Sequence, residues 1–353
     1  MRKGQRGRCP FVFSAVLLFN PGLILCTPGT GFMKSNTLLS LLSDRAVHSG
    51  ESLAKTLGVS RTAVWKQLRK IMDEGVEIKT IRGQGYQLVT PVDLLDRGQV
   101  LAGLPGELLS GISLEVLPEV GSTNAEVAQR LSGAGGAIPV VIADCQTAGR
   151  GRRGRNWASP KGQNLYLSMG LTLQGGFAAL EGLSLVLGVA VARALEAMGA
   201  EGVGLKWPND LFADGRKFAG ILVEIQGELQ EGVVQVIAGI GINVHMTRAE
   251  EVDQPWISLA ERWPDIAWAR NALAANVIRE ILGTVDTFER QGFAAFRSAW
   301  QRRDIFCGQE LVSRGGEVAG TGAGIDDGGN YLLKTDAGVV SVRAGDISLR
   351  VQP

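Results

Sequence analysis

Residues 149–157 read Gly-Arg-Gly-Arg-Arg-Gly-Arg-Asn-Trp and are separated by four residues from the end of an apolar run, 140–144, that is typical of a buried strand. The three glycines have the spacing of the dinucleotide-binding fingerprint. That fingerprint needs a helix immediately after the glycines, whereas residues 155–162 include a proline and a glycine and predict a loop. The run also lacks the acidic residue expected about 20 positions further on. We therefore expect an arginine-rich loop here and not a dinucleotide-binding turn.

This loop carries four arginines within six residues, in a part of the chain that is otherwise acidic. Such a cluster repels itself unless it holds an anion, and the planar guanidinium group suits phosphate and carboxylate groups. The glycines let the backbone close around a ligand. We interpret the loop as a mobile lid over a phosphorylated compound. A solvated basic loop and a nucleic-acid-binding patch are the alternatives.

The length of 353 residues predicts two or three domains, each large enough for a core of its own. The formal net charge of +1 is unevenly distributed, since residues 1–32 and 33–90 each carry +4 and the remaining 263 residues carry −7. This distribution confines any nucleic-acid contact to the N-terminal part. The two histidines and four cysteines have no metal-ligand spacing, which argues against a zinc site, a disulfide framework and histidine-based triad chemistry.

The first 32 residues begin with four basic residues and an apolar run, 11–19, as a signal peptide does. Asn20-Pro21-Gly22 interrupts the run, however, and no small-residue cleavage site follows. The segment is also too short for a transmembrane helix, which needs roughly 20 uninterrupted apolar residues. We interpret Met33 as the start of the working protein and residues 1–32 as a non-native upstream extension, with an export signal as the alternative.

The region after Met33 has the pattern of a winged helix-turn-helix domain. Apolar residues recur at helical spacing in 38–42 and 64–71, a short helix is expected over 50–57, and residues 76–88 alternate as two strands around a turn. Cations and hydroxyls remain on the outer face of the third helix, the element that enters the major groove in such domains. A protein-interaction module with a solvated basic face is the alternative. The candidate DNA-binding residues are Arg61, Thr62, Trp65, Lys66, Arg69 and, at the tip of the wing, Arg82.

Three further motifs lie in the middle of the chain. The run 121–124, Gly-Ser-Thr-Asn, begins a helix, where free backbone N–H groups and hydroxyls favour an anionic or urea-like ligand. Lys206 and Lys217 flank a turn and suit the charge that develops in phosphoryl or nucleotidyl transfer, while Asp210 is placed to orient a lysine or hold Mg²⁺. The run 239–243, Gly-Ile-Gly-Ile-Asn, ends a strand, and its glycines permit a flat ligand to approach closely.

Taken in order, the motifs at 121–124, 149–155, 206–210, 216–220 and 239–243 resemble those of the biotin–protein ligases. With the winged helix in front, the chain is most similar to the bifunctional biotin ligase/repressors of bacteria, over essentially all of 33–353. The resemblance implies a cytoplasmic, ATP-dependent enzyme that makes biotinyl-5′-AMP and transfers biotin to a lysine of the biotin carboxyl carrier protein of acetyl-CoA carboxylase. It also implies a biotin-responsive repressor that binds operator DNA of the biotin biosynthesis operon as an adenylate-bound homodimer.

The resemblance further implies roles for the residues at matching positions. The catalytic set would be Lys217, Arg152, Lys206 and Asp210. The biotin-binding set would be Ser122, Thr123, Asn124, Gln146, Gly149, Arg150, Gly151, Arg152, Lys217 and Gly220. The ATP-binding or adenylate-binding set would be Arg150, Arg152, Arg155, Trp157, Lys206, Asn209 and Asn243. No side chain is assigned as a metal ligand; Mg²⁺ would bind through the ATP phosphates, with Asp210 as a candidate ligand.

The expected fold class is α+β. It comprises a winged helix-turn-helix domain over 33–92, a ligase-type catalytic α/β domain with a mixed sheet over 93–303, and an SH3-like β-barrel over 304–353. Two alternatives stay open: a ligase whose DNA-binding domain is vestigial, and a biotin-sensing transcription factor without transfer activity. A lipoate ligase fits less well, because those enzymes lack the Gly/Arg loop. No membrane partner is expected.

Overall fold

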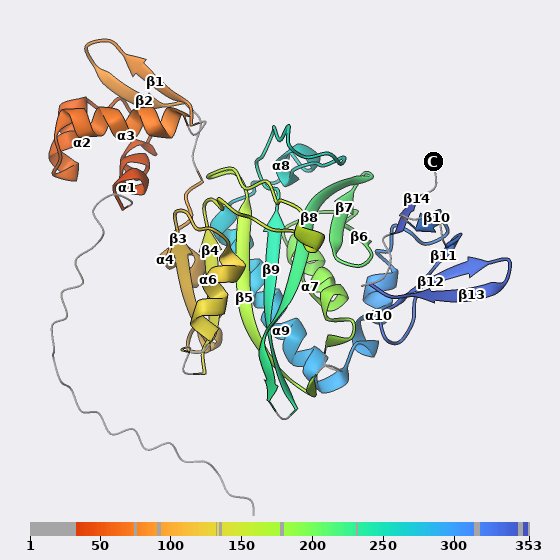
Figure 1. Cartoon of the computed structure of the whole chain (residues 1–353). Coiled ribbons are helices and arrows are strands. Elements are labelled where there is room, and N and C mark those ends of the chain that lie inside the picture. The colour runs from red at the N-terminus through yellow and green to blue at the C-terminus, as the bar shows by residue number, and fades with distance from the viewer. Residues whose placement is uncertain are drawn as a thin grey trace, which may run out of the picture.

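The computed structural model describes residues 33–73, 76–89, 93–131, 133, 136–176, 180–230, 232–313, 318–344 and 349–351. Three parts follow one another along the chain: a helical part with a hairpin, a seven-stranded sheet with helices on both faces, and a five-stranded sheet (Figure 1). The predicted α+β class with a mixed central sheet is confirmed. The expected upstream extension, residues 1–32, lies outside the described residues.

The first part is a winged helix-turn-helix. Its elements are α1 (Met33–Leu42), α2 (Gly50–Leu57), α3 (Arg61–Asp73) and the antiparallel wing strands β1 (Ile78–Ile81) and β2 (Gly85–Leu88). Ser49 caps α2 by accepting a hydrogen bond from the Ser52 N–H at 3.0 Å, and Gly58 ends it in the left-handed conformation with φ 63°. The Ser60 hydroxyl accepts from the Ala63 N–H at 3.2 Å at the start of α3. Gly58 and Ser60 together fix the turn between α2 and α3.

Helix α3 turns one face to the core and the other to solvent. Val64, Leu68 and Ile71 are buried. Trp65 is 45% exposed, and the guanidinium carbon of Arg69 lies 5.3 Å from its ring centroid. The other candidate DNA-binding residues are exposed as well: Arg61, Thr62 and Lys66 on α3 and Arg82 on the wing. The outer face therefore carries the cations and hydroxyls that the sequence pattern places there.

The central sheet has the strand order β3-β4-β5-β9-β8-β7-β6. Strands β3 and β4 are parallel and are joined by α6, whereas the other neighbours are antiparallel. The bounds are β3 (Ile112–Leu117), β4 (Ile138–Ala143), β5 (Leu165–Gln174), β6 (Gly204–Lys206), β7 (Asp210–Ala213), β8 (Arg216–Gln230) and β9 (Val233–Ile242).

Helices cover both faces of this sheet (Figure 1). Helix α6 (Thr123–Leu131) packs on one face, where Gly170 leaves no room for a Cβ because that atom would stand 2.6 Å from the Leu131 side chain. Helices α7 (Leu183–Ala197) and α9 (Arg270–Gln291) pack on the other. The short helices are α4 (Arg97–Ala102), α5 (Gly106–Leu109), α8 (Leu259–Arg262), α10 (Ala294–Gln301) and the 3-10 turn η1 (Arg152–Gly154). Within the described part of the chain, none of the helices combines the length and apolar character needed to cross a membrane.

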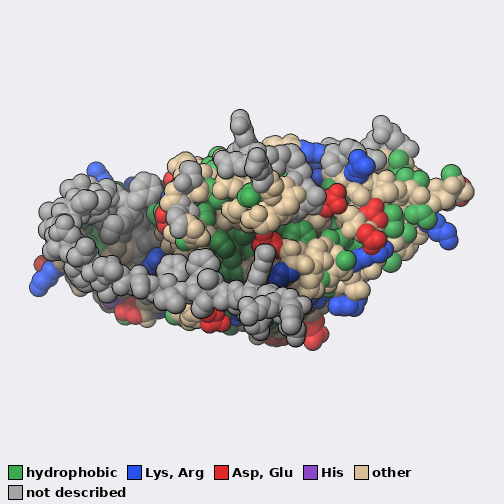
Figure 2. Space-filling model, turned by 90° about the horizontal axis from the view of Figure 1, so that it is seen from below, with side chains coloured by type: hydrophobic (Ala, Val, Ile, Leu, Met, Phe, Trp, Pro, Cys, Tyr) green, Lys and Arg blue, Asp and Glu red, His purple; other side chains and the backbone are tan. Residues whose placement is uncertain are grey.

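The C-terminal part is an antiparallel sheet of SH3-like kind, in the order β13-β12-β11-β10-β14. Its strands are β10 (Glu310–Ser313), β11 (Ala319–Ile325), β12 (Tyr331–Thr335), β13 (Gly338–Val342) and β14 (Leu349–Val351). The indole Nε1 of Trp207 donates to the Gly329 carbonyl at 3.0 Å and so joins this sheet to the central one. Hydrophobic side chains reach the surface of the C-terminal part, at the right of Figure 2. Among them, Val339 of the edge strand β13 is 64% exposed.

Side-chain caps decide where two helices of the central part begin. Helix α4 begins at Arg97, because the Asp96 carboxylate caps it by accepting from the Gln99 N–H at 2.8 Å. Helix α6 begins at Thr123, inside the run 121–124 that was expected to begin a helix, and the Gln146 amide oxygen accepts that residue's N–H at 2.9 Å. The first cap is local, whereas the second comes from 23 residues away, so local signals do not report it.

A buried arginine joins the winged-helix part to the sheet. Arg270, at the start of α9, is 0% exposed. Its guanidinium donates to the backbone carbonyls of Asp93 and Asn164 and forms an ion pair with the Asp144 carboxylate at 2.9 Å. Asp93 lies in the linker after the wing, Asp144 directly follows β4, and Asn164 directly precedes β5. One side chain therefore fixes the linker to two strands of the sheet.

Replacement of Arg270 by leucine should lower the free energy of unfolding by about 3–5 kcal/mol, because the Asp144 carboxylate, 2% exposed, would stay buried without its cation. The shift of the urea midpoint, followed by tryptophan fluorescence, measures this change. Arg290→Leu is a matched control on the same helix, where the ion pair with Asp286 is 64% and 65% exposed. The control should cost less than about 1 kcal/mol, and equal shifts in the two variants would contradict the assignment.

Candidate active site

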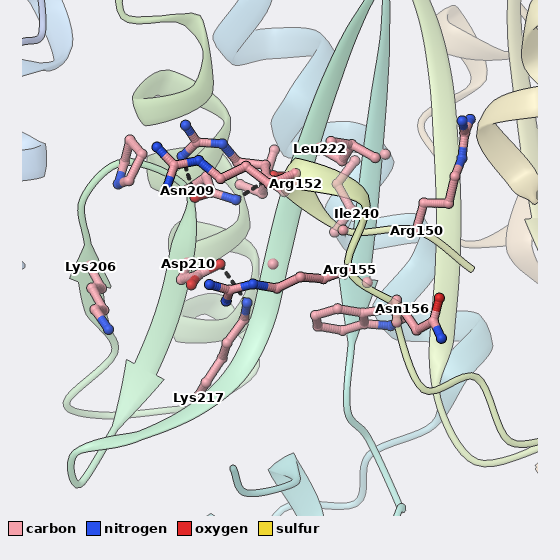
Figure 3. A pocket seen from close by; sticks show the side chains of 18 of the residues that line it. Arg150, Arg152, Arg155, Asn156, Lys206, Asn209, Asp210, Lys217, Leu222 and Ile240 are labelled. Atoms are coloured by element: carbon pink, nitrogen blue, oxygen red, sulfur yellow. Dashed lines mark hydrogen bonds and ion pairs between the residues drawn. The ribbon is translucent and has the colours of Figure 1, made fainter. Parts of the chain in front are cut away.

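A pocket opens on the face of the central sheet that also carries α6. Strands β8 and β9 form its floor, the start of α6 forms one end, the turn between β6 and β7 forms the other end, and the Gly/Arg loop covers it (Figure 3). Leu349 and Arg350 of β14 complete the wall. Segments more than 200 residues apart in the sequence therefore meet at one site.

Two features of the strands make the floor flat and cationic. Gly220 of β8 stands opposite Gly241 of β9, so neither strand raises a side chain there. A β-bulge at Phe218 shifts the register of β8 against β7. The extra residue turns Lys217 to the pocket face although it lies three positions before Gly220. A Cβ on Gly220 would stand 3.3 Å from the Lys217 Nζ, which shows how closely the ammonium group approaches the floor.

The indole of Trp157 lies on this glycine floor. A Cβ would stand 2.5 Å from its Cε2 at Gly241 and 3.0 Å from its Cζ3 at Gly220. Gly239 and Gly241 were expected to receive a flat ligand. At Gly241 the flat group is instead the protein's own indole, and at Gly239 a Cβ would stand 2.2 Å from the Asn124 amide oxygen. The Lys217 Nζ lies 5.2 Å from the ring centroid. The indole Nε1 is buried and has no hydrogen-bond acceptor among the described residues, so it is available to donate to a ligand.

Hydrogen-bonding side chains occupy the end of the pocket at α6. The Gln146 amide oxygen accepts from both the N–H and the hydroxyl of Thr123, at 2.9 and 3.1 Å. The buried Ser168 hydroxyl lies 2.7 Å from the Thr123 hydroxyl and 2.6 Å from the Asn124 amide oxygen. Two hydroxyl protons serve three short O···O contacts, which leaves acceptor capacity for an N–H group of a ligand. This end of the pocket suits a urea-like group.

Cations gather at the opposite end. The Lys217 Nζ and the Asp210 carboxylate are 2.7 Å apart, with the side chains 13% and 20% exposed, and Figure 3 shows them facing each other. Lys206 packs its ammonium over the rings of Phe212 and Phe306, at 4.8 and 5.6 Å from the centroids. Burial lowers the pKa of Lys206, and the Asp210 charge acts in the opposite direction. This end suits anionic groups.

The Gly/Arg loop, residues 149–157, forms an arginine lid over the pocket and is anchored at two points. Arg152 donates to the Asn209 amide oxygen at 2.9 Å and to the Ala344 carbonyl at 2.5 Å. Burial lowers the pKa of Arg152, again opposed by the Asp210 charge. Ala344 follows strand β13, so the C-terminal part of the chain holds the lid in place. Arg150 lies two residues before Arg152 in the loop and is 52% exposed.

Most of the residues that the sequence analysis singled out for this site line the pocket. They are Ser122, Thr123, Asn124, Gln146, Arg150, Gly151, Arg152, Arg155, Trp157, Lys206, Asn209, Asp210, Lys217 and Gly220. The structure does not bring the other two to the cavity. Gly149 is packed within the loop, where a Cβ would stand 2.7 Å from the Ser159 hydroxyl. Asn243 is 5% exposed, and its amide donates to the Ile257 carbonyl at 3.3 Å.

Several lining residues had no role in the sequence analysis. They are Trp207, Pro208, Ile221, Leu222, Ile240, Gln254, Leu349 and Arg350. Trp207 and Pro208, which are joined by a cis peptide bond, belong to the quoted motif 206–210. That motif was therefore a signal that these two residues lie at the site. Leu222 alternates with Gly220 along β8, and a period of two would have placed it on the floor. Arg350 has no local signal, because only the tertiary fold brings β14 to the pocket.

Comparisons with known proteins agree with this geometry. The model of the biotin/lipoate A/B protein ligase family matches residues 136–243, and an HTH-domain model matches residues 34–87. The bifunctional ligase/repressor BirA of Escherichia coli is 43% identical over 326 residues, which cover 90% of this chain and 99% of that protein. BirA of Bacillus subtilis is 33% identical over 315 residues, which cover 85% and 93%.

A solved structure shows the same likeness. The biotin protein ligase from Aquifex aeolicus in complex with biotin and ATP superimposes with a TM-score of 0.58 at 30% identity, covering 68% of this chain and 99% of that one. The sequence likeness, in contrast, extends over both the HTH domain and the ligase domain. The chain therefore belongs to the family of bifunctional ligase/repressors that BirA represents, with a catalytic part of the biotin/lipoate protein ligase type.

Proposed function

We propose that the chain is an ATP-dependent biotin–protein ligase that also represses the biotin biosynthesis operon in response to biotin. The observation that carries the ligase activity is one pocket that joins an acceptor-rich end to a cationic end beneath an arginine lid. The first end suits the ureido ring of biotin, and the second suits its carboxylate together with the phosphates of ATP. The domains we propose are 33–92, 93–303 and 304–353.

In the first step, an oxygen of the biotin carboxylate attacks the α-phosphorus of ATP, and the bond to pyrophosphate breaks. Biotinyl-5′-AMP and pyrophosphate are the products. Lys217 stands where the two anions meet, and Asp210 holds its ammonium group in place at 2.7 Å. Preorganised cations stabilise the charge that develops on the phosphate oxygens in the transition state. Lys206, Arg155 and Asn209 support the nucleotide from the same end of the pocket.

In the second step, the amine of a carrier-protein lysine attacks the acyl carbon of the adenylate. The bond to AMP breaks, AMP leaves, the amine loses a proton, and an amide remains. Arg150 and Arg152 cover the adenylate between the two steps. Because Arg152 bonds to both Asn209 and Ala344, the lid is held from two sides while the adenylate waits for the carrier.

Mg²⁺ is proposed to enter with ATP, bound to its phosphates. Asp210, the candidate ligand, is paired with Lys217. In residues 33–351 as far as they are described, no group of three or more metal-ligating side chains comes together. The pairing of Asp210 with Lys217 supports a cation that the nucleotide brings, which would neutralise phosphate charge when bound.

For the repressor activity, the proposed partners are operator DNA and a second copy of the chain when biotinyl-5′-AMP is bound. The exposed cations of α3 and the wing support contact with the DNA backbone, and Trp65 with Arg69 offers contact in the major groove. The site of both activities is proposed to be the bacterial cytoplasm, where the carrier protein and the operator are found together with ATP.

Replacing Lys217 by alanine should lower biotin-dependent ATP–pyrophosphate exchange by at least about 100-fold, because the cation at the reacting centre is lost. Isotope exchange between pyrophosphate and ATP measures this step without the carrier. Lys334→Ala, an exposed lysine on β12, is the control and should keep the wild-type rate. Normal exchange by the Lys217 variant would refute the assigned role. If the wild-type protein gives no exchange, the chain is a biotin sensor without transfer activity.

Arg152→Gly should still form biotinyl-5′-AMP but release it, because the lid loses its contacts to Asn209 and Ala344. Biotin labelling of bystander lysines, on serum albumin mixed with the enzyme and ATP, should rise at least about tenfold over wild type. An avidin blot measures the labelling. Wild-type labelling of albumin together with normal adenylate formation would show that Arg152 does not retain the intermediate.

Arg82→Ala should weaken binding of the full chain to a biotin-operator fragment and lower the slope of log affinity against log salt concentration by about 1, because one phosphate contact is lost. Gel shifts at several salt concentrations, with biotin and ATP present, provide the slope, and Lys334→Ala is again the control. Absence of any shift by the wild-type chain at moderate salt, with and without biotin and ATP, would mean that the winged helix is vestigial.

A further inference from the structure

Glu224 stands beside the biotin end of the pocket without lining it. It lies on β8 two residues beyond Leu222, opposite Ile237 of β9, and so on the sheet face that carries α6 and the pocket. The side chain is 33% exposed. The catalytic and binding sets taken from the sequence do not include it. Its position, between the start of α6 and the lid, calls for an explanation.

One carboxylate serves two neighbours here. The Asn124 side-chain amide donates to the Glu224 carboxylate at 2.7 Å. The Arg150 guanidinium lies 3.3 Å from the other oxygen of the same carboxylate. Asn124 belongs to the wall of the pocket at α6, and Arg150 belongs to the lid. Glu224 is therefore the group that both the wall and the lid contact on this side of the pocket.

The carboxylate also decides which way the Asn124 amide points. An ionised carboxylate only accepts hydrogen bonds, so the NH₂ group must face Glu224 and the amide oxygen must face the Ser168 hydroxyl at 2.6 Å. The amide lies directly on Gly239, where a Cβ would stand 2.2 Å from its oxygen. The space and the hydrogen bonds thus permit one orientation. That orientation fixes the donor and acceptor pattern at the urea-like end.

We propose that Glu224 is a positioning residue for biotin binding. Glu224 orients Asn124 and draws Arg150 over the biotin, so that the wall at α6 and the lid close on the ligand together. This inference rests on the proposed ligase function. Glu224 acts through Asn124 and Arg150 and is remote from the reacting centre: in Figure 3, Arg150 lies on the far side of the pocket from Lys217 and Asp210. Its loss therefore weakens biotin binding and leaves the chemical step unchanged.

The two contacts can be separated by substitution. In Glu224→Gln, the new amide oxygen still accepts from Asn124, but the charge that attracts Arg150 is gone. In Glu224→Ala, both contacts are gone. Each variant is made in the wild-type chain and in Arg150→Gln. Glu115→Gln is the matched control, because it removes a carboxylate from an ion pair with Arg130, 2.7 Å long, on β3 outside the pocket.

The KM for biotin and the kcat of ATP–pyrophosphate exchange are measured with the full chain, together with its thermal midpoint. Glu224→Gln should raise the KM about fivefold and Glu224→Ala about 20-fold or more, with kcat within about twofold of wild type. In the Arg150→Gln background, Glu224→Gln should have no further effect, whereas Glu224→Ala should still raise the KM. The control should leave KM and kcat unchanged.

Three results would overturn the inference. The first is a wild-type KM in both Glu224 variants, and the second is a fall in kcat at constant KM. The third is a further rise in KM when Glu224→Gln is added to Arg150→Gln. A general loss of packing would lower the thermal midpoint and kcat together, and that pattern also counts against positioning. Absence of exchange in the wild-type chain itself would instead overturn the proposed ligase function. The two failures are therefore distinguishable.

Discussion

The Arg270 guanidinium is the constraint on which the arrangement of the first two parts depends. It is fully buried and paired with an equally buried carboxylate, Asp144, so neither charge is solvated if the other is withdrawn. Asp144 stands two residues before Gln146, which holds the first N–H of α6. Asp93, which also contacts Arg270, lies in the linker that follows the wing. The same ion pair therefore sets the position of the α6 end of the pocket and the point at which the winged-helix part leaves the sheet.

Local signals in the sequence predicted the elements whose ends are decided locally. Ser60 and Gly58 are local signals for the turn between α2 and α3, and both residues cap a helix end in the structure. The α+β class, the lid without a following helix and the cations around 206–217 could likewise be predicted, because short runs of residues carry their chemistry. The group that caps α6 could not, because its first N–H is bound by Gln146, 23 residues away.

The floor of the pocket could be predicted from the sequence only in part. Gly220 and Gly241 correctly indicate a close approach, since no Cβ fits there. The sequence does not say which flat group approaches, and the group is Trp157 from the lid. Ser168 and Arg350 were missed for a related reason. Each takes its role from strand register or from the docking of the C-terminal sheet, and neither is encoded by the residues next to it.

The charge distribution of the body follows from the same geometry. Residues 91–353 have a net charge of −7 and yet carry a cationic pocket, in which acids pair with two of the cations: Asp210 with Lys217, and Glu224 with Arg150. Each acid lowers the repulsion among neighbouring cations. Arg152 differs, since it is held by two neutral oxygens, from Asn209 and Ala344. Among the described residues no carboxylate forms an ion pair with Arg152, and the Asp210 charge acts on it only at longer range. Its guanidinium therefore suits an anionic ligand.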